Sequence, residues 1–229
     1  MTDAFVITPP PTVVVPVKGG GSFPVRRIFC VGRNYAEHAR EMGHDPEREP
    51  PFFFMKPADA VVTGGADVPY PPQTADLHHE VELVAAISKA GADIAVGEAL
   101  SHVYGYGVGL DLTRRDLQQA LRKAGRPWEM GKAFDRSAPI GDIAPVAMTG
   151  YPGAARIELR VNGETRQSAS TADMTWSIPE IIAELSRFVA LAPGDLIFTG
   201  TPAGVSALAR GDRLEGSVEG VGAVAFRIA

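Results

Sequence analysis

Glycine and proline divide this chain into short segments. The 229 residues include 25 glycines and 19 prolines, which interrupt the sequence along its whole length. Proline donates no backbone hydrogen bond and glycine weakens a helix interior, so few long helices fit between the interruptions. The remaining segments are short, and many are apolar. The sequence therefore predicts a β-rich α+β fold, with many short strands and a few flanking helices.

The first residues of the chain form a separate region by composition. Residues 1–24 contain the run Pro9-Pro10-Pro11 and a run of three glycines. Because proline fixes φ, we expect an extended arm here that runs over the surface. No repeat, linker or low-complexity block interrupts the rest of the sequence, so residues 25–229 are expected to form a single domain.

Short-range patterns predict a hairpin and two helix starts. Asn162-Gly163 stands between two strand-like segments and is a strong signal for a hairpin turn. Ser177 with Glu180, and Thr113 with Asp116, have the spacing of a capping box at the start of a helix. Other expected strands cover residues 26–31, 52–55, 80–88, 103–112, 195–199, 212–218 and 221–228.

Charge and cysteine content exclude several classes of protein. The formal net charge is −5 and the pI is about 5.6, which does not fit a nucleic-acid partner. Cys30 is the only cysteine, so no internal disulfide and no cysteine-rich zinc site can form. No signal peptide is recognisable, and no apolar run approaches the ~20 residues that span a bilayer. We expect a cytoplasmic protein with no membrane partner.

The heptapeptide LHHEVEL, residues 77–83, places two imidazoles and two carboxylates in an otherwise apolar strand. Side chains alternate along a strand, so Glu80 and Glu82 project from the same face as His78. His79 falls on the other face, which is apolar and therefore expected to be buried. Two glutamates on one face can hold a cation, but in most strands such a pair is simply exposed to water.

A third carboxylate, Asp111, ends an apolar strand just before an expected helix. An unpaired carboxylate is costly to bury there, so it either accepts hydrogen bonds at the helix start or serves as a third metal ligand. Three carboxylates without a cysteine suit a hard cation, Mg²⁺ or alternatively Mn²⁺. The two histidines of LHHEVEL do not complete a zinc-type cluster, because they lie on opposite faces.

Seven stretches of the sequence occur in an order typical of one enzyme family. They are FCVGRNYAEHAREM, FFFMKPADAVV, LHHEVEL, GYGVGLDLTRRDLQ, PWEMGKAFDRSAPIG, LRVNGETRQ and GDLIFTGTPAGV. From about Pro16 onward the chain resembles the fumarylacetoacetate hydrolase family, and above all its short acylpyruvate hydrolases. The resemblance implies that residues 25–229 are a fumarylacetoacetase-like catalytic domain, a mixed β-roll or sandwich with flanking helices, and that the protein is a homodimer.

The resemblance also implies the residues of the site. The family's metal ligands match Glu80, Glu82 and Asp111, in agreement with the alternation of faces. A water-activating pair matches His38 and Glu41, three residues apart on a helix. The implied lysine is Lys132, which would stabilise an oxyanion or protonate the leaving enol. The implied substrate contacts are Arg33, Tyr35, Gln118 and Thr201.

These residues imply hydrolysis of the carbon–carbon bond of an acylpyruvate, with fumarylpyruvate from aromatic degradation as the expected substrate. A divalent cation would polarise the keto group and stabilise charge on the departing pyruvate enolate. His38 would take a proton from water, oriented by Glu41. Without the resemblance, the same pair would be interpreted as a surface ion pair, and Lys132 as a solvated side chain.

Alternative functions stay open at this level. Decarboxylation of oxaloacetate, and isomerisation or decarboxylation of a hydroxy-dienedioate, also pass through an enolate, so the metal ligands do not distinguish them. A non-catalytic domain that binds a metal or a dicarboxylate is a more distant alternative. The cation that holds a distal carboxylate is Arg33, Arg40 or Lys56, which the sequence does not rank. The charged loop over residues 43–51, bounded by glycine and proline, is expected to act as a lid.

Overall fold

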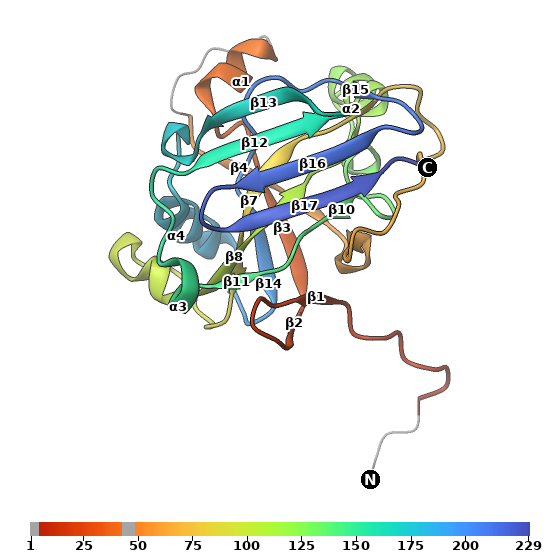
Figure 1. The fold of residues 1–229 in the computed structure, drawn as a ribbon. Coiled ribbons are helices and arrows are strands. Elements are labelled where there is room, and N and C mark those ends of the chain that lie inside the picture. Colours follow the sequence, from red (N-terminus) through yellow and green to blue (C-terminus); the bar gives the residue numbers. More distant parts are fainter. Residues whose placement is uncertain (1–4, 43–48) are drawn as a thin grey trace.

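The computed structural model describes residues 5–42 and 49–229. Most of loop 43–51, expected to act as a lid, lies outside these residues. Two sheets dominate, and the smaller lies across the larger (Figure 1). The larger sheet has the order β11-β8-β7-β14-β3-β4, with bounds β3 Arg27–Gly32, β4 Phe52–Lys56, β7 Val81–Ile87, β8 Val103–Leu110, β11 Ala144–Pro145 and β14 Asp195–Phe198. The smaller has the order β13-β12-β16-β17, with bounds β12 Arg156–Val161, β13 Glu164–Ser170, β16 Arg213–Val218 and β17 Gly222–Arg227.

Small sheets and helices complete the described fold. The short strands are β1 Val14–Pro16, β2 Ser22–Pro24, β5 Val61–Val62, β6 Leu77–His78, β9 Thr113–Arg114, β10 Ala138–Pro139 and β15 Ala207–Leu208. The α-helices are α1 Ala36–Glu41, α2 Arg115–Lys123, α3 Val146–Thr149 and α4 Ile178–Phe188. The 3₁₀ helices are η1 Ala58–Ala60, η2 Val96–His102, η3 Glu129–Gly131 and η4 Thr171–Asp173. The predicted β-rich α+β class is confirmed, and none of the helices in the described ranges is long and apolar enough to cross a membrane.

The central strand β7 is buried on both of its faces. Leu83 and Ala85 face the core between the two sheets, whereas Val84 and Ala86 face a second core on the other side of the larger sheet. The larger sheet is mixed, because β14 runs parallel to β3 and antiparallel to β7. No face of β7 is exposed to water, so Glu80 and Glu82 are buried, whereas His78, in β6, is half-buried. The alternative interpretation, in which the two glutamates are simply exposed to water, is therefore wrong.

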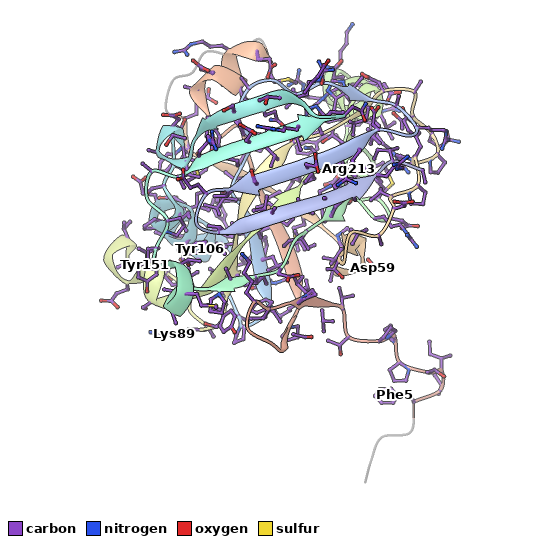
Figure 2. The ribbon with its side chains drawn as sticks, viewed as in Figure 1. Phe5, Asp59, Lys89, Tyr106, Tyr151 and Arg213 are labelled. Carbon is purple, nitrogen blue, oxygen red and sulfur yellow. The ribbon has the colours of Figure 1, made fainter. Side chains whose placement is uncertain are left out.

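The beginning of the chain leaves the sheets before it joins them. Residues 5–12 are exposed, and the label of Phe5 marks a segment that extends away from the sheets (Figure 2). Further on, β1 and β2 form an antiparallel hairpin. Val15 and Phe23 of this hairpin are buried in the second core, beside the strands β3 and β14. The division of the chain at residue 24 stays a prediction.

Two of the local predictions are confirmed and one is wrong. Asn162-Gly163 forms the hairpin turn between β12 and β13, with φ of 52° and 82°. Ser177 donates its backbone N–H to Glu180 at the start of α4, as a capping box requires. Thr113, in contrast, lies in β9 and pairs with His78. It cannot cap α2, which begins at Arg115, because strand pairing draws it into the small sheet.

Candidate active site

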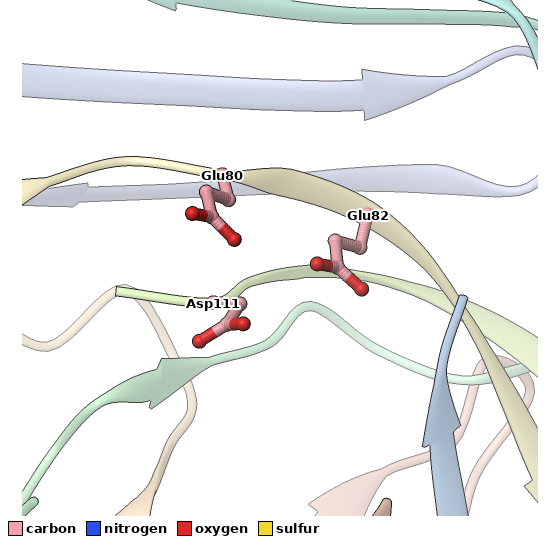
Figure 3. Close-up of side chains that lie close together, drawn as sticks. All are labelled: Glu80, Glu82 and Asp111. Atoms are coloured by element: carbon pink, nitrogen blue, oxygen red, sulfur yellow. The ribbon is translucent and has the colours of Figure 1, made fainter. Parts of the chain in front are cut away.

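Antiparallel pairing of β7 with β8 brings three carboxylates together. Val81 lies opposite Leu110 in the register, and the backbone N–H of Asp111 donates to the carbonyl of Glu80 across 2.8 Å. Asp111 therefore lies beside Glu80 and Glu82, although it comes from a different motif. Each side chain is buried, and one oxygen from each lies within 4.8 Å of the others (Figure 3). This is the cluster that the alternation of LHHEVEL and the position of Asp111 predict.

The chemistry of this cluster fits a hard divalent cation. Carboxylate oxygens are the preferred ligands of Mg²⁺ and Mn²⁺, and three of them converge here. Burial, together with the charges of Asp111 and Glu80, raises the pKa of Glu82 well above its usual range. A cation bound by the three side chains would favour the charged form of Glu82, because it would supply the nearby positive charge that Glu82 lacks.

Basic side chains compensate the other two carboxylates. Lys132 Nζ donates to Glu80 Oε2 across 2.8 Å and to Asp111 Oδ2 across 2.6 Å, and Arg115 donates to Glu80 Oε1. Burial raises the pKa of Glu80, but the charges of Lys132 and Arg115 outweigh it and hold that pKa well below its usual range. Burial lowers the pKa of Lys132, but Asp111 and Glu80 reverse the effect, so that pKa is raised. The ammonium form of Lys132 is therefore stable.

Lys56 supports the cluster from behind. Its Nζ lies 2.8 Å from Asp111 Oδ1 and donates to the carbonyls of Leu112 and Lys132. Two of its three N–H groups donate to these carbonyls, and the ammonium forms an ion pair with Asp111. Lys56 is fully buried in this position and does not line the cavity. Of the three cations considered as partners of a distal substrate carboxylate, Lys56 is therefore excluded.

A cavity of about 320 Å³ opens in front of the carboxylates. Its volume is within the range of small-molecule sites, which begins at about 300 Å³. The predicted residues that line it are Arg33, His38, Glu80, Glu82, Gln118, Lys132 and Thr201. Asp111 lies behind Lys132, and Glu41 reaches the cavity through His38. The fold therefore brings predicted residues from five separate motifs into one cavity.

His38 and Glu41 form a pair on α1 in which the imidazole is buried and the carboxylate side chain is 33% exposed. His38 is 6% exposed, and its Nδ1 lies 3.1 Å from Glu41 Oε2. The backbone N–H of Gly204 also donates to Glu41, across 3.0 Å, and so ties α1 to the loop after β14. Since a carboxylate only accepts, Nδ1 of His38 carries a hydrogen, and in the neutral ring Nε2 carries the lone pair.

Tyr35 is the predicted residue that the structure separates from the cavity. Its side chain is buried beside α1 and lines a different depression, next to Glu37 and Asp173. Burial, followed by the charges of Glu82 and Asp173, raises the pKa of the Tyr35 hydroxyl. Tyr35 is not among the residues that line the main cavity, and its contact with substrate stays a prediction.

The two histidines of LHHEVEL stand apart from the carboxylates. His78 Nε2 lies 2.9 Å from Asp76, away from the cluster. His79 is fully buried, as predicted for the apolar side, and contacts Gln167 and Ser206 at 2.9 Å each. Burial lowers the pKa of His79 to about 4, so the ring is neutral. Neither imidazole is part of the candidate metal centre.

Thr201 lines the cavity with its hydroxyl already engaged. Its Oγ1 donates to the carbonyl of Val81 across 2.8 Å and accepts from Gln167 across the same distance. A hydroxyl has a single hydrogen. The hydroxyl hydrogen is therefore engaged, and the contact of Thr201 with substrate, which stays a prediction, would be made by its backbone N–H group.

The sequence did not predict several of the residues that line the cavity. Phe52, Phe54 and Trp128 form an aromatic wall, in which the Trp128 ring centroid lies 6.5 Å from Phe52 and 5.2 Å from Phe54. Alternation along β4 could have placed Phe52 and Phe54 on one face. Arg115 contacts Glu80 and also donates to Gln118 across 2.7 Å. The other lining residues that were missed are Val31, Gly32, Met42 and Arg122.

Comparisons with known proteins agree with this site. A family model described as fumarylacetoacetate (FAA) hydrolase C-terminal matches residues 27–229. A fumarylpyruvate hydrolase from Pseudomonas aeruginosa, solved in complex with Mn²⁺ and pyruvate, is 54% identical with a TM-score of 0.97 and 99% coverage of both chains. A fumarylpyruvate hydrolase from Ralstonia sp is 43% identical over 80% of this chain and 95% of its own. The mitochondrial oxaloacetate tautomerase of Mus musculus is 41% identical over 89% of this chain and 91% of its own. The chain belongs to the fumarylacetoacetate hydrolase family.

Proposed function

We propose that this chain hydrolyses the carbon–carbon bond of an acylpyruvate, with fumarylpyruvate as the first candidate substrate. The observation that carries the proposal is the presence, in one cavity, of a buried carboxylate cluster and the His38–Glu41 pair. A cluster alone would suit many reactions of a 2-keto acid. The added pair supplies what hydrolysis needs, a base next to the site. The similarity to fumarylpyruvate hydrolases supports the choice of substrate.

Glu80, Glu82 and Asp111 would hold Mg²⁺ or Mn²⁺, which when bound polarises a keto oxygen and stabilises the negative charge of an enolate. The protein contributes the position of this charge. Lys132 bridges Glu80 and Asp111, and its raised pKa keeps it an ammonium. We therefore assign Lys132 to the stabilisation of developing negative charge and not to proton donation.

His38 is assigned the role of general base. Glu41 holds the Nδ1 hydrogen, so Nε2 is the atom that takes a proton from water. The hydroxide oxygen then forms a bond to the acyl carbonyl carbon. The bond between that carbon and the CH₂ group of the pyruvoyl part breaks, and its electron pair stays on the CH₂ carbon. The proton held by His38 balances the reaction when it is returned to this carbon, which gives a carboxylic acid and pyruvate.

The backbone and α2 position the substrate. Gln118 lines the cavity and accepts from Arg115, so its amide is oriented from behind by an arginine that also contacts Glu80. The loop after β14 carries Thr201, which lines the cavity, and the backbone N–H of Thr201 is the donor that we assign to the pyruvoyl carboxylate. Glu41 and Glu82 both accept N–H groups of this loop, from Gly204 and Gly200.

Tautomerisation of oxaloacetate is a second candidate. The observation that favours it is the identity of 41% to the tautomerase of Mus musculus and of 42% to that of Escherichia coli K12. Keto–enol exchange moves a proton and adds no water. It therefore needs the carboxylate cluster and one base, but no attack on a carbonyl.

The two functions are separated by one experiment. Purified protein is incubated with Mg²⁺ or Mn²⁺ and, in parallel, with fumarylpyruvate, acetylpyruvate or enol-oxaloacetate. Loss of enol absorbance is followed, and pyruvate is measured enzymatically in each product mixture. We expect one pyruvate for each fumarylpyruvate consumed, and no turnover in chelator. Conversion of enol-oxaloacetate, with no pyruvate formed from either acylpyruvate in Mg²⁺ or Mn²⁺, would overturn the proposed hydrolase function and support tautomerase activity instead.

A further inference from the structure

Arg33 is a cation of the cavity that the carboxylate cluster does not engage. Arg115 and Lys132 also line the cavity, but both contact Glu80, and Lys132 contacts Asp111 as well. Within residues 5–42 and 49–229, no carboxylate forms an ion pair with Arg33. A positive charge that faces a cavity without an acidic partner favours an anionic group of the ligand.

The surroundings hold Arg33 in place. Its φ is 52°, in the left-handed region that side chains other than glycine rarely adopt. Such a conformation persists only where the neighbouring structure enforces it. Gly32 pairs with Phe52 at the end of β3, and a Cβ on Gly32 would lie 2.1 Å from the Phe52 ring. The ring therefore closes onto the backbone, and the guanidinium of Arg33 stacks on it with Cζ 5.0 Å from the centroid.

The aromatic wall beside Arg33 suits a flat acyl chain. Phe52, Phe54 and Trp128 line the same cavity, and each phenylalanine packs edge-to-face against Trp128. Apolar ring surfaces stabilise a planar, conjugated carbon chain but give nothing to a second carboxylate. A ligand with charge at both ends therefore needs a cation beyond the wall, apart from the basic groups that the cluster has already engaged.

We propose that Arg33 binds the terminal carboxylate of the acyl group and makes the site selective for acylpyruvates whose acyl part is a dicarboxylate. The planar guanidinium matches a carboxylate with two parallel hydrogen bonds. This proposal rests on the hydrolase function and names the class of substrate that the site selects. Arg40, a candidate from the sequence, is exposed on α1 and does not line the cavity. Arg122 does line it, but its side chain is on an exposed position of α2, where water weakens an ion pair.

The experiment compares Arg33→Gln with Arg40→Gln, which removes the same charge outside the cavity. kcat/KM is measured on fumarylpyruvate, which has the terminal carboxylate, and on acetylpyruvate, which lacks it. Since a hydrogen bond to a charged group contributes about 1.5–3 kcal/mol, we expect Arg33→Gln to lower kcat/KM on fumarylpyruvate by about 10- to 100-fold. Acetylpyruvate should change by less than about 2-fold, and Arg40→Gln should leave both values unchanged. Arg33→Lys, which keeps the charge without the fork, should fall between.

Each other outcome overturns a specific statement. An equal loss on both substrates makes Arg33 a residue of the common site and removes its role in selectivity. A selective loss in Arg122→Gln but not in Arg33→Gln moves the role to α2. Hydrolysis of acetylpyruvate but not of fumarylpyruvate by the unaltered protein overturns the selectivity and leaves the hydrolase function intact. Hydrolysis of neither overturns the proposed function itself. The thermal melting temperature of each variant serves as the control for correct folding, so that an equal loss on both substrates is not mistaken for misfolding.

Discussion

The side-chain amide of Gln167 donates a hydrogen bond of 2.8 Å to the hydroxyl of Thr201. Backbone groups determine the orientation of this amide. The N–H of Val81 can only donate, so it identifies Oε1 at 3.1 Å, and the carbonyl of Pro202 can only accept, so it identifies Nε2 at 2.7 Å. His79, whose Nδ1 contacts Oε1, must then carry its hydrogen on Nδ1. One residue of β13 therefore connects the strand of Glu82 with the loop of Thr201.

Replacement of Gln167 by Met should destabilise the protein. Met has a similar length but no amide, so Val81, Pro202 and His79 lose a buried partner. An unsatisfied buried group costs about 1–3 kcal/mol, so we expect the free energy of unfolding to fall by about 3 kcal/mol or more. Urea denaturation measures it. Gln73→Met, at an exposed position, is the control and should change stability by less than about 0.5 kcal/mol. Equal midpoints for the two variants would contradict the assignment of the network.

Glu82→Gln should have opposite effects on stability with and without metal. In chelator, the variant should melt at a higher temperature than the unaltered protein, because burial and two neighbouring carboxylates disfavour the charged form of Glu82. With Mn²⁺ the order should reverse, since a ligand is lost and the metal no longer stabilises the folded state as strongly. Thermal melts in chelator and in Mn²⁺, with calorimetric titration of Mn²⁺, measure both effects.

The control for Glu82 is Glu184→Gln, which removes a carboxylate from α4 outside the cluster. It should leave Mn²⁺ affinity unchanged. If Glu82→Gln binds Mn²⁺ as tightly as this control, Glu82 is not a ligand and the cluster has another role.

His38→Gln should reduce kcat on fumarylpyruvate by about 10²- to 10⁴-fold, the usual contribution of a general base. Mn²⁺ affinity should not change, because His38 is outside the carboxylate cluster. Glu37→Gln, exposed on the same helix, is the matched control and should retain activity. Stopped-flow measurement of pyruvate release gives the rates. A His38→Gln enzyme that retains full hydrolytic rate would remove this residue from the mechanism.

The sequence predicted the parts of the site that local rules govern. Alternation along LHHEVEL put Glu80 and Glu82 on one side, and strand pairing then brought Asp111 to them. The hairpin at Asn162-Gly163 followed from φ preferences alone. Other features depend on packing between distant segments. That both faces of β7 are covered cannot be known without the second core, and the homodimer stays a prediction.

Residues that were missed or misplaced share the same physical cause. Tyr35 stands in the motif of His38, but its side chain is buried and lines a different depression from the one that His38 lines. Gln167 is 86 residues from Val81 and contacts it only because the two sheets pack together. Thr113 has a good capping sequence, yet pairing of β9 with β6 takes precedence over it. Local sequence cannot weigh such long-range contacts.

Acidification should destabilise the protein through His79. Burial lowers its pKa in the folded state to about 4, against 6.5 for an ordinary histidine. Below pH 6.5 the unfolded chain therefore binds a proton before the folded chain does, so stability falls as the pH drops from 6.5 towards 4 and is unaffected by this group above 6.5. These two pKa values correspond to a loss of about 2 kcal/mol of stability at pH 5.

Urea denaturation in chelator, at pH 7.5 and at pH 5, measures this effect. The difference in the free energy of unfolding between the two pH values should be about 2 kcal/mol smaller in His79→Gln than in the unaltered protein. The variant loses hydrogen bonds and is less stable at both pH values, so the informative quantity is the change between them. An identical change in both proteins would mean that His79 does not couple protonation to folding.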